Sequence, residues 1–282
     1  DSERFAGAVR TYSCEGLMQD NRALQAGTSH FLGQNFAKAF DTTFQTAEGG
    51  IDHVWSTSWG VSTRLVGGLI MTHSDDRGLI CPPRLAQYQV VLVPIYRKEA
   101  DRTMVLEAAG SVRDELRNAG IRVHVDDREG MTPGARYYEW EARGAPFRLE
   151  LGPRDLAAGT AMLARRTGGD KTPLKLEGIA AALSGEIQQM QSGLLTAARS
   201  RREANSRRGL SKAEFIGYLA GGGGFVYGGW CGEASCENEV KEQTKATVRV
   251  LPEPEFRSEE APKTCQWCDR PSLAEAVRAR AY

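Results

Sequence analysis

Four cysteines near the C-terminus have the spacing of a metal site. Four residues separate Cys231 from Cys236, two separate Cys265 from Cys268, and 28 residues lie between the two pairs. Two such pairs can bring four sulfur atoms to one tetrahedral ion, each at about 2.3 Å from zinc. Because the sequence shows no secretory signal and cytosolic chains seldom keep disulfides, we expect a structural Zn²⁺ here. The spacing leaves two disulfides or four free thiols open as alternatives.

The charge balance argues against a chain that binds polyanions with its whole surface. The 282 residues include 36 basic and 36 acidic side chains, so the formal net charge is zero. A local basic patch can still bind nucleic acid, and one run of basic residues is opposed only by Glu203. This run predicts either contacts to RNA phosphates or a solvated helix face. Its members are Arg199, Arg201, Arg202, Arg207, Arg208 and Lys212.

Length and composition bound the class of protein. A chain of 282 residues suggests about two domains, and 41% apolar with 26% charged residues is ordinary for a soluble globular protein. No apolar run approaches the roughly 18 to 20 residues of a membrane span, so we expect no membrane partner. The sequence opens with Asp1-Ser2-Glu3, without an initiator Met or a signal peptide. We therefore expect a fragment of a longer, cytoplasmic protein.

The first of three regions along the chain, residues 1–85, predicts β-structure with functional loops. It is rich in Gly, Thr, Ser and aromatic residues, with short extended stretches around Phe44 and Trp59. The segment 62–71 has a hydroxyl residue that can cap a helix, followed by apolar residues at helical spacing. Pro82-Pro83 then marks a boundary, because a diproline continues neither a helix nor a central strand.

The middle region, residues 86–190, alternates apolar strands with amphipathic helices. We expect strands at 90–95, 121–125 and 147–151, with helices at 101–119 and 133–143 between them. This βαβαβ succession predicts a mixed or parallel sheet covered by helices. No G-x-G-x-x-G follows its first strand, so dinucleotide binding has little support. A long helix from Leu174 to Arg199 should lead into the third region, residues 191–282.

Long strings of the sequence resemble the prolyl-tRNA synthetases of the archaeal and eukaryotic-like type. Residues 12–20 (YSCEGLMQD) and 24–36 (LQAGTSHFLGQNF) resemble the core of that family's catalytic domain, and 57–64 (TSWGVSTR) resembles its version of class II motif 3. Residues 152–156 (GPRDL) resemble its anticodon-binding domain. The cysteine quartet and the terminal Tyr282 resemble its appended zinc domain.

The resemblance implies a multidomain fold of α/β and α+β type. It consists of the C-terminal part of a class II antiparallel-sheet catalytic domain (1–85), a mixed-sheet α/β anticodon-binding domain (86–190) and a small α+β zinc-binding domain (191–282). The implied activity is proline–tRNA ligation. L-Proline is activated to prolyl-adenylate with ATP, which brings Mg²⁺, and is then transferred to tRNA(Pro). The full-length enzyme of the family is a homodimer.

The resemblance also implies an ATP site and a proline site. Arg64 would be the catalytic arginine of motif 3, because a fixed guanidinium stabilises charge that develops on phosphate. Gln25, Thr28 and Ser62 would make further ATP contacts. His30, flanked by Phe31 and roofed by Trp59, would line the proline pocket together with Gly60. Without the resemblance, a lone histidine beside apolar residues is more typical of the core than of a site.

The anticodon readers of the family fall on Glu141, Arg148 and Lys171. A carboxylate can accept from a guanine edge, and an arginine can donate to guanine O6 and N7. Ordinary surface charge is the alternative for all three residues.

Some features of a complete class II enzyme are not in the sequence. Motif 1 of the dimer interface, the motif 2 arginine and the loop that binds the proline imino group are missing. We therefore expect the chain to begin inside the catalytic domain and to be unable to form prolyl-adenylate alone. A non-catalytic tRNA-binding module is one rival interpretation, and another class IIa synthetase, for threonine, glycine or histidine, is a second.

Overall fold

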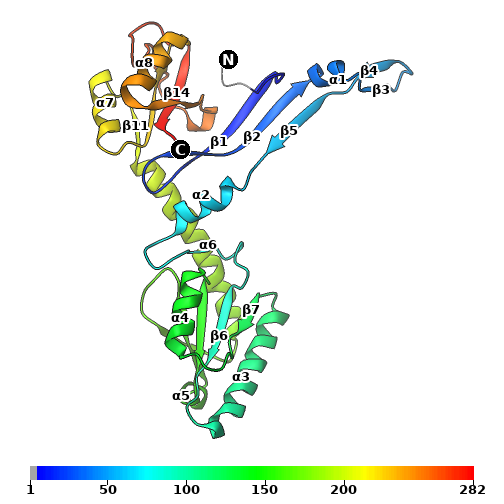
Figure 1. Ribbon diagram of the computed structural model, residues 1–282, viewed down its shortest axis with the longest axis vertical. Coiled ribbons are helices and arrows are strands. Elements are labelled where there is room, and N and C mark those ends of the chain that lie inside the picture. The colour runs from blue at the N-terminus through cyan, green and yellow to red at the C-terminus, as the bar shows by residue number, and fades with distance from the viewer. Residues whose placement is uncertain (1–4) are drawn as a thin grey trace. The chain divides into compact units, whose positions relative to one another are not determined.

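The computed structural model describes residues 5–282, which form two compact units (Figure 1). One unit combines Ser200–Tyr282 with the described residues up to Gly68, and the other is Leu69–Arg199. The three-domain division with boundaries at 85 and 190 stays a prediction. No helix within 5–282 has the length and apolar character needed to span a membrane.

An antiparallel sheet in the order β1–β2–β5 forms the N-terminal part of the first unit. A tight turn joins β1 to β2, and Asn21 in that turn has a left-handed backbone (φ 64°), which asparagine tolerates better than most residues. These strands confirm the predicted β-structure of this region. They are β1 (Arg10–Leu17), β2 (Ala23–Gly33) and β5 (Ser56–Gly60).

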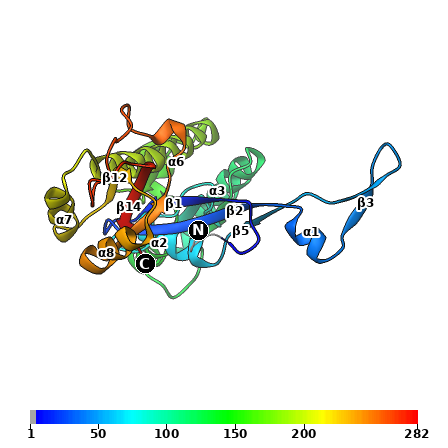
Figure 2. The ribbon, with the colours of Figure 1, turned by 90° about the horizontal axis from the view of Figure 1, so that it is seen from above.

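The connection from β2 to β5 carries a short helix and a separate two-stranded hairpin. Figures 1 and 2 show both at the end of β2 that lies far from the β1–β2 turn. They are α1 (Asn35–Ala39), β3 (Thr43–Gln45) and β4 (Ile51–His53). After β5 the expected helix is present as α2 (Arg64–His73), which confirms the predicted succession of strand, turn and helix.

A mixed sheet in the order β11–β12–β14–β13 forms the C-terminal part of the same unit. β11 is parallel to β12, and the other neighbours are antiparallel. A Cβ on Gly229 of β12 would lie 1.9 Å from the Thr264 carbonyl oxygen, so glycine is required where this loop crosses the strand. The elements are β11 (Ser206–Arg208), α7 (Lys212–Ala220), β12 (Phe225–Trp230), α8 (Ala234–Thr244), β13 (Ala246–Val250), the 3₁₀ helix η1 (Pro254–Phe256) and β14 (Ala274–Arg280).

The β1–β2–β5 sheet and the C-terminal sheet of this unit share a buried ion pair and a small apolar core. Glu15 of β1 accepts hydrogen bonds from Arg249 of β13 at 3.0 and 3.2 Å, and the Glu15 side chain is only 4% exposed. Ala23 at the start of β2 forms a bridge with Ala281. The C-terminal sheet therefore supports the β1–β2 hairpin. The shared core consists of Leu17, Ala23, Phe225, Tyr227, Val277 and Ala279.

The second unit is an α/β domain with a five-stranded mixed sheet in the order β10–β9–β8–β6–β7. Successive side chains of the central strand β6 point to opposite faces. Val90 and Leu92 join the core formed with α3, whereas Val91 and Val93 pack with Trp140 of α4, so the two helices cover opposite faces (Figure 1). The elements are β6 (Val90–Pro94), α3 (Glu99–Asn118), β7 (Val123–Val125), α4 (Pro133–Ala142), β8 (Phe147–Leu151), α5 (Pro153–Ala157), β9 (Thr160–Arg165), β10 (Thr172–Lys175) and α6 (Ile179–Ala204).

The predicted βαβαβ succession and mixed sheet are confirmed, with one correction after them. A helix over Leu174–Arg199 is wrong at its start, because Thr172–Lys175 forms strand β10 and α6 begins only at Ile179. Pro173 can occupy an edge strand, where its missing N–H costs no ladder bond. Gly178, with φ 71°, separates the strand from the helix.

Candidate functional site

One face of the β1–β2–β5 sheet is lined with polar side chains, three of which (Gln25, Thr28 and His30) are predicted to contact ATP or proline. We call it the polar face; its residues are Thr11, Ser13, Gln25, Thr28 and His30. Thr28 lies opposite Ser13 and His30 lies opposite Thr11, and residues opposite each other share a face, as does every second residue of a strand. Gln25 Nε2 donates to Ser13 Oγ at 3.2 Å, which holds Gln25 on this face.

Arg64 reaches the polar face from the start of α2. Its Nη1 donates to the Gln25 carbonyl oxygen at 3.3 Å, and its backbone N–H donates to Ser62 Oγ at 3.3 Å. Gly60 lies opposite Thr28, and a Cβ at position 60 would lie 4.0 Å from the Thr28 hydroxyl. The structure therefore brings the four predicted ATP residues together. The Arg64 guanidinium is exposed, and the carbonyl oxygen it contacts is neutral.

His30 lies in an aromatic setting on the polar face. Its ring stacks on Phe5 with 4.5 Å between centroids, Nδ1 is 3.0 Å from Thr11 Oγ1, and the residue is only 9% exposed. Trp59 lies opposite Ser29, so it points to the other face and is 78% exposed. The pleat of the sheet therefore does not place Trp59 over His30 as a roof. Their proline-binding roles, and that of Gly60, stay predictions.

In the α/β unit, two predicted anticodon readers share one buried carboxylate. Glu150 of β8 is 7% exposed and accepts from Arg148 Nε and Nη2 at 3.1 Å each, and Lys171 Nζ lies 2.6 Å from one of its oxygens. Tyr137 of α4 stacks with both cations: Arg148 Cζ lies 4.0 Å and Lys171 Nζ 4.9 Å from its ring centroid. Burial, and after it the Glu150 charge, raises the pKa of Tyr137, so the phenol is protonated at neutral pH.

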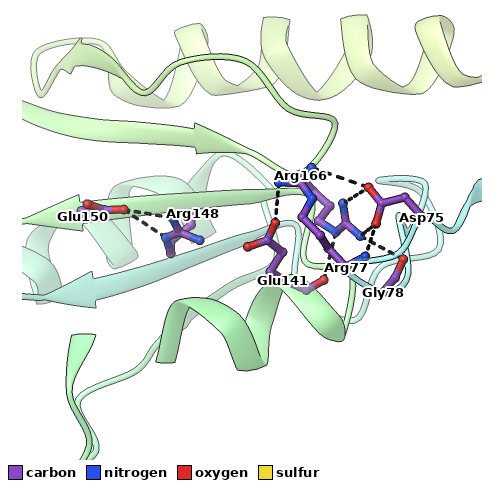
Figure 3. Close-up of polar contacts among 7 residues, drawn as sticks. All are labelled: Asp75, Arg77, Gly78, Glu141, Arg148, Glu150 and Arg166. Carbon is purple, nitrogen blue, oxygen red and sulfur yellow. Dashed lines mark hydrogen bonds and ion pairs between the residues drawn. The ribbon is translucent and has the colours of Figure 1, made fainter. Parts of the chain in front are cut away.

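Glu141, the third predicted reader, has different partners in the same unit (Figure 3). Its carboxylate pairs with the exposed Arg77 at 2.7 Å, and its carbonyl oxygen accepts from Arg166 Nε at 2.9 Å. Arg166 is itself buried and also donates to Asp75 and to the Gly78 carbonyl oxygen. The hydrogen-bonded Arg166 guanidinium holds the pKa of Asp75 well below its usual range. A second cluster of charges thus fixes the backbone beside Glu141.

Four of these partners were missed by sequence reasoning: Asp75, Tyr137, Glu150 and Arg166. Asp75 and Arg166 are 91 positions apart, and no local pattern connects them. Glu150 did have a signal, because it follows Arg148 by two positions in a predicted strand and opposite charges there share a face.

The cysteine quartet converges as its spacing predicts. The four sulfur atoms lie within 4.8 Å of one another, and both closest pairs, Cys236 with Cys265 and Cys231 with Cys268, are 3.7 Å apart. Four ligands at about 2.3 Å from zinc stand about 3.8 Å apart at the corners of a tetrahedron, so the quartet fits that ion. A disulfide needs sulfurs about 2 Å apart, and the six described cysteines are all unpaired thiols.

One cysteine of the quartet is prepared to be a thiolate. Burial raises the pKa of Cys265, but the backbone amides of Trp267 and Cys268 outweigh it and lower that pKa to about 6. Burial instead raises the pKa of Cys236 and of Cys231. Thiolates are the form that binds metal, and the four converging thiols could hold a metal ion.

The basic run of residues 199–212 is not one solvated helix face. Arg207 and Arg208 lie on strand β11, and their guanidinium carbons lie 5.2 and 3.9 Å from the ring centroids of Tyr218 and Tyr227. The helix-face interpretation is wrong for these two arginines, because a parallel pairing with β12 takes them out of α6. Contacts to RNA phosphates stay a prediction.

Known proteins are similar to this chain along its whole length. A family model described as "Anticodon binding domain" matches residues 89–186, and one described as "Prolyl-tRNA synthetase, C-terminal" matches residues 213–282. Proline–tRNA ligase of Chlorobium phaeovibrioides is 49% identical over 100% of this chain and 59% of its own length. Proline–tRNA ligase 2 of Clostridioides difficile is 44% identical over 100% of this chain and 57% of its own length.

A solved structure is also similar to this chain along its whole length. The crystal structure of prolyl-tRNA synthetase from Cryptosporidium parvum, complexed with halofuginone and AMPPNP, matches with a TM-score of 0.90 and 32% identity over 100% of this chain and 59% of that one. The chain is a homologue of the proline–tRNA ligases. The resemblance predicted from the sequence is thus confirmed.

The matches also assign the two best-defined clusters to regions of the ligase. The anticodon-binding model includes Glu141, Arg148 and Lys171 with their partner Glu150, and the C-terminal model includes the cysteine quartet. The chain spans 57–59% of the length of the ligases it matches.

Proposed function

We propose that the chain provides part of a proline–tRNA ligase, which activates L-proline with ATP and transfers it to tRNA(Pro). The observation that carries the proposal is the set of hydrogen bonds that joins Arg64 to Gln25 and Ser62, with Thr28 on the same sheet face as Gln25, in a chain similar throughout to such ligases. On this proposal, β1, β2 and β5 are the C-terminal part of a class II catalytic domain.

The exposed Arg64 would bind the triphosphate of Mg²⁺–ATP. A guanidinium hydrogen-bonded to a neutral oxygen keeps its full charge for a phosphate, and it would stabilise the charge that develops as pyrophosphate leaves. Ser62 holds the backbone N–H of Arg64, and Gln25 supplies the carbonyl that orients the guanidinium. Gln25 and Thr28 would contact the nucleoside part of ATP.

His30 would bind proline beside this ATP site. Phe5 covers its ring and Thr11 holds Nδ1, so Nε2 is the polar atom left for a small apolar substrate. Gly60, opposite Thr28, would leave room for the ligand, whereas Trp59 lies on the other face of the sheet and takes no part in this proposal.

Glu141, Arg148 and Lys171 would read the anticodon, with donors for guanine acceptor edges and a carboxylate for guanine N–H groups. We further propose that the cysteine quartet binds a structural Zn²⁺, that the longer protein is a homodimer, and that it works in the cytoplasm.

A chimaera tests the proposed function. This chain would replace the matching 59% of the C. phaeovibrioides ligase, and proline-dependent exchange of pyrophosphate into ATP and charging of tRNA(Pro) would be measured. We expect both activities, with alanine giving no exchange. A folded chimaera that binds tRNA(Pro) without exchanging pyrophosphate would contradict the proposal and support the rival, a non-catalytic tRNA-binding module.

A further inference from the structure

Glu150 is a buried carboxylate to which the proposed function gives no role. Both of its oxygens have basic partners. Arg148 donates through Nε and Nη2 at 3.1 Å to Oε1, and Lys171 Nζ lies 2.6 Å from that oxygen and donates to Oε2 at 2.9 Å. The Arg148 side chain is 14% exposed and that of Lys171 is 44% exposed, so the cluster opens to solvent on the lysine side.

The pleat of β8 places Arg148 and Glu150 on one face of the sheet. Along β8, Phe147, Leu149 and Leu151 fill the core on one face, so Arg148 and Glu150 point to the face that carries α4. Their partners on β9 are Ala164 and Met162. Alanine opposite Arg148 projects only a methyl group toward that side chain.

Glu150 decides which hydrogens of Arg148 stay available. A guanidinium has five N–H groups, and Glu150 takes the one on Nε and one on Nη2. The outer edge, formed by Nη1 and the second Nη2 hydrogen, then presents two parallel donors. Two adjacent acceptors, such as O6 and N7 of guanine, match that edge. Tyr137 lies against the face of the same guanidinium and fixes its plane.

Glu150 also limits the charge of the cluster. Two cations with one carboxylate leave a net charge of +1, whereas Arg148 and Lys171 alone would carry +2. An unbalanced pair of cations would attract any RNA phosphate, and phosphate contacts carry no sequence information.

We propose that Glu150 is a positioning and specificity-determining residue that aims Arg148 and Lys171 at a guanine edge of single-stranded RNA and suppresses their binding to phosphates. The inference rests on the proposed anticodon-binding role of those two residues. Proline codons pair with anticodons that contain two guanines, so such an edge is present in the expected RNA.

The test uses the full chain with short hairpins of the tRNA(Pro) anticodon arm, in which each guanine of the anticodon is kept or changed to adenine. Affinities are measured by fluorescence anisotropy from low to high salt. The parent chain should prefer the guanine hairpin by about tenfold or more, as a good bidentate contact to a base allows.

Glu150→Gln should reduce that preference to about threefold or less. It should also bind the adenine hairpin more tightly at low salt and steepen the salt dependence by about one phosphate contact. Glu186→Gln is the matched control, because Glu186 is also partly buried and paired with an arginine, Arg165, in the same unit. This control should keep the preference of the parent.

Three outcomes separate the interpretations. If Glu150→Gln lowers the affinity for both hairpins equally and keeps the preference for guanine, Glu150 has only a structural role and the inference is wrong. If Arg148→Ala also keeps the preference, the proposed anticodon-reading role itself is wrong. Should thermal unfolding show that Glu150→Gln does not fold, Glu150→Asp replaces it. The shorter carboxylate should lower the preference for the guanine hairpin while the salt dependence of binding stays that of the parent chain. An unchanged preference overturns the inference.

Discussion

The polar face differs in the balance of its charges from the anticodon cluster, our name, after its proposed role, for Arg148, Lys171, Glu150 and Tyr137. Within residues 5–282 the exposed Arg64 guanidinium hydrogen-bonds to the neutral carbonyl oxygen of Gln25, whereas Arg148 and Lys171 share the carboxylate of Glu150. A triphosphate brings several negative charges, so a cation that binds it gains most when its charge is not yet neutralised. A base edge brings only partial charges, so its reader gains from a fixed direction. We infer that charge balance within the protein distinguishes a phosphate-binding site from a base-reading site.

The two regions differ also in what supports them. The polar face rests on the C-terminal sheet through Glu15–Arg249 and Ala23–Ala281. The anticodon cluster is built entirely within Leu69–Arg199. Damage to the C-terminal sheet should therefore affect the polar face and leave the anticodon cluster intact.

The largest expected effect is that of removing the metal from the cysteine quartet. Structural zinc contributes about 10 kcal/mol or more of binding free energy to small zinc domains, so Cys265→Ser should destabilise the C-terminal sheet by several kcal/mol. We expect about one equivalent of zinc in the purified chain and less than half in the variant. Hydrogen exchange should accelerate in β14 and in the β1–β2 hairpin but not in β6 or β8. Cys14→Ser, an exposed thiol in β1, is the control. A parent chain with less than half an equivalent of zinc rules out the site.

Arg64→Ala should slow adenylation in the chimaera by roughly a hundredfold or more, or about 3 kcal/mol, because the unbalanced cation opposite the phosphates is lost. Arg64→Lys should recover part of the rate, since it restores the charge without the fork of the guanidinium. Arg10→Ala removes an exposed arginine from the same sheet and should change little. Pyrophosphate-exchange rates at saturating proline and ATP would measure this, and a rate within threefold of the parent contradicts the role of Arg64.

Buried carboxylates that are paired with arginines should make the stability of the α/β unit depend on pH. Burial raises the pKa of Asp126, but hydrogen bonds from Arg128 and Trp140 outweigh it and lower that pKa to about 2. The folded state then favours the carboxylate, so its contribution is complete above about pH 5 and disappears as the pH falls toward 2. Asp126→Asn should lower the free energy of unfolding by roughly 2 kcal/mol at pH 7, and the stability of the variant should fall less steeply between pH 5 and pH 2.

The exposed Asp114 is the control for Asp126. It also pairs with an arginine, Arg113, but surface pairs contribute little, so Asp114→Asn should leave the unfolding curve nearly unchanged. Hydrogen exchange of β7 and α4 between pH 7 and pH 3 would report on this unit within the whole chain. Equal acid sensitivity of parent and Asp126→Asn would contradict the prediction.

Sequence patterns predicted the helices and strands and many of the candidate site residues, but not the oppositely charged partners of those residues. Cysteine spacing determined the quartet, and the apolar run at 90–95 determined the central strand, because both depend on neighbours a few positions apart. Arg166–Asp75 and Arg249–Glu15 join residues 91 and 234 positions apart, and only the assembled fold brings them together. The expectation that Trp59 covers His30 failed for another reason. Strand register decides the face to which a side chain points, and a shift of one position moves it to the opposite face.

The smallest expected effect concerns the neutral part of the polar face. His30→Ala would remove the ring that Phe5 and Thr11 hold in place. If His30 lines the proline pocket, the Michaelis constant for proline should rise about tenfold in the chimaera, while that for ATP changes less than twofold. His30→Asn, which can keep a polar atom near Nδ1, should recover part of the affinity for proline.

Thr11→Val is the informative partner variant, because it frees the ring of His30 without removing it and should raise the Michaelis constant for proline by a smaller factor. Pyrophosphate exchange with each substrate varied in turn would separate the two constants. An unchanged proline constant in a stable His30→Ala variant would place this histidine in the core of the sheet, and the polar face would then be a site for ATP alone.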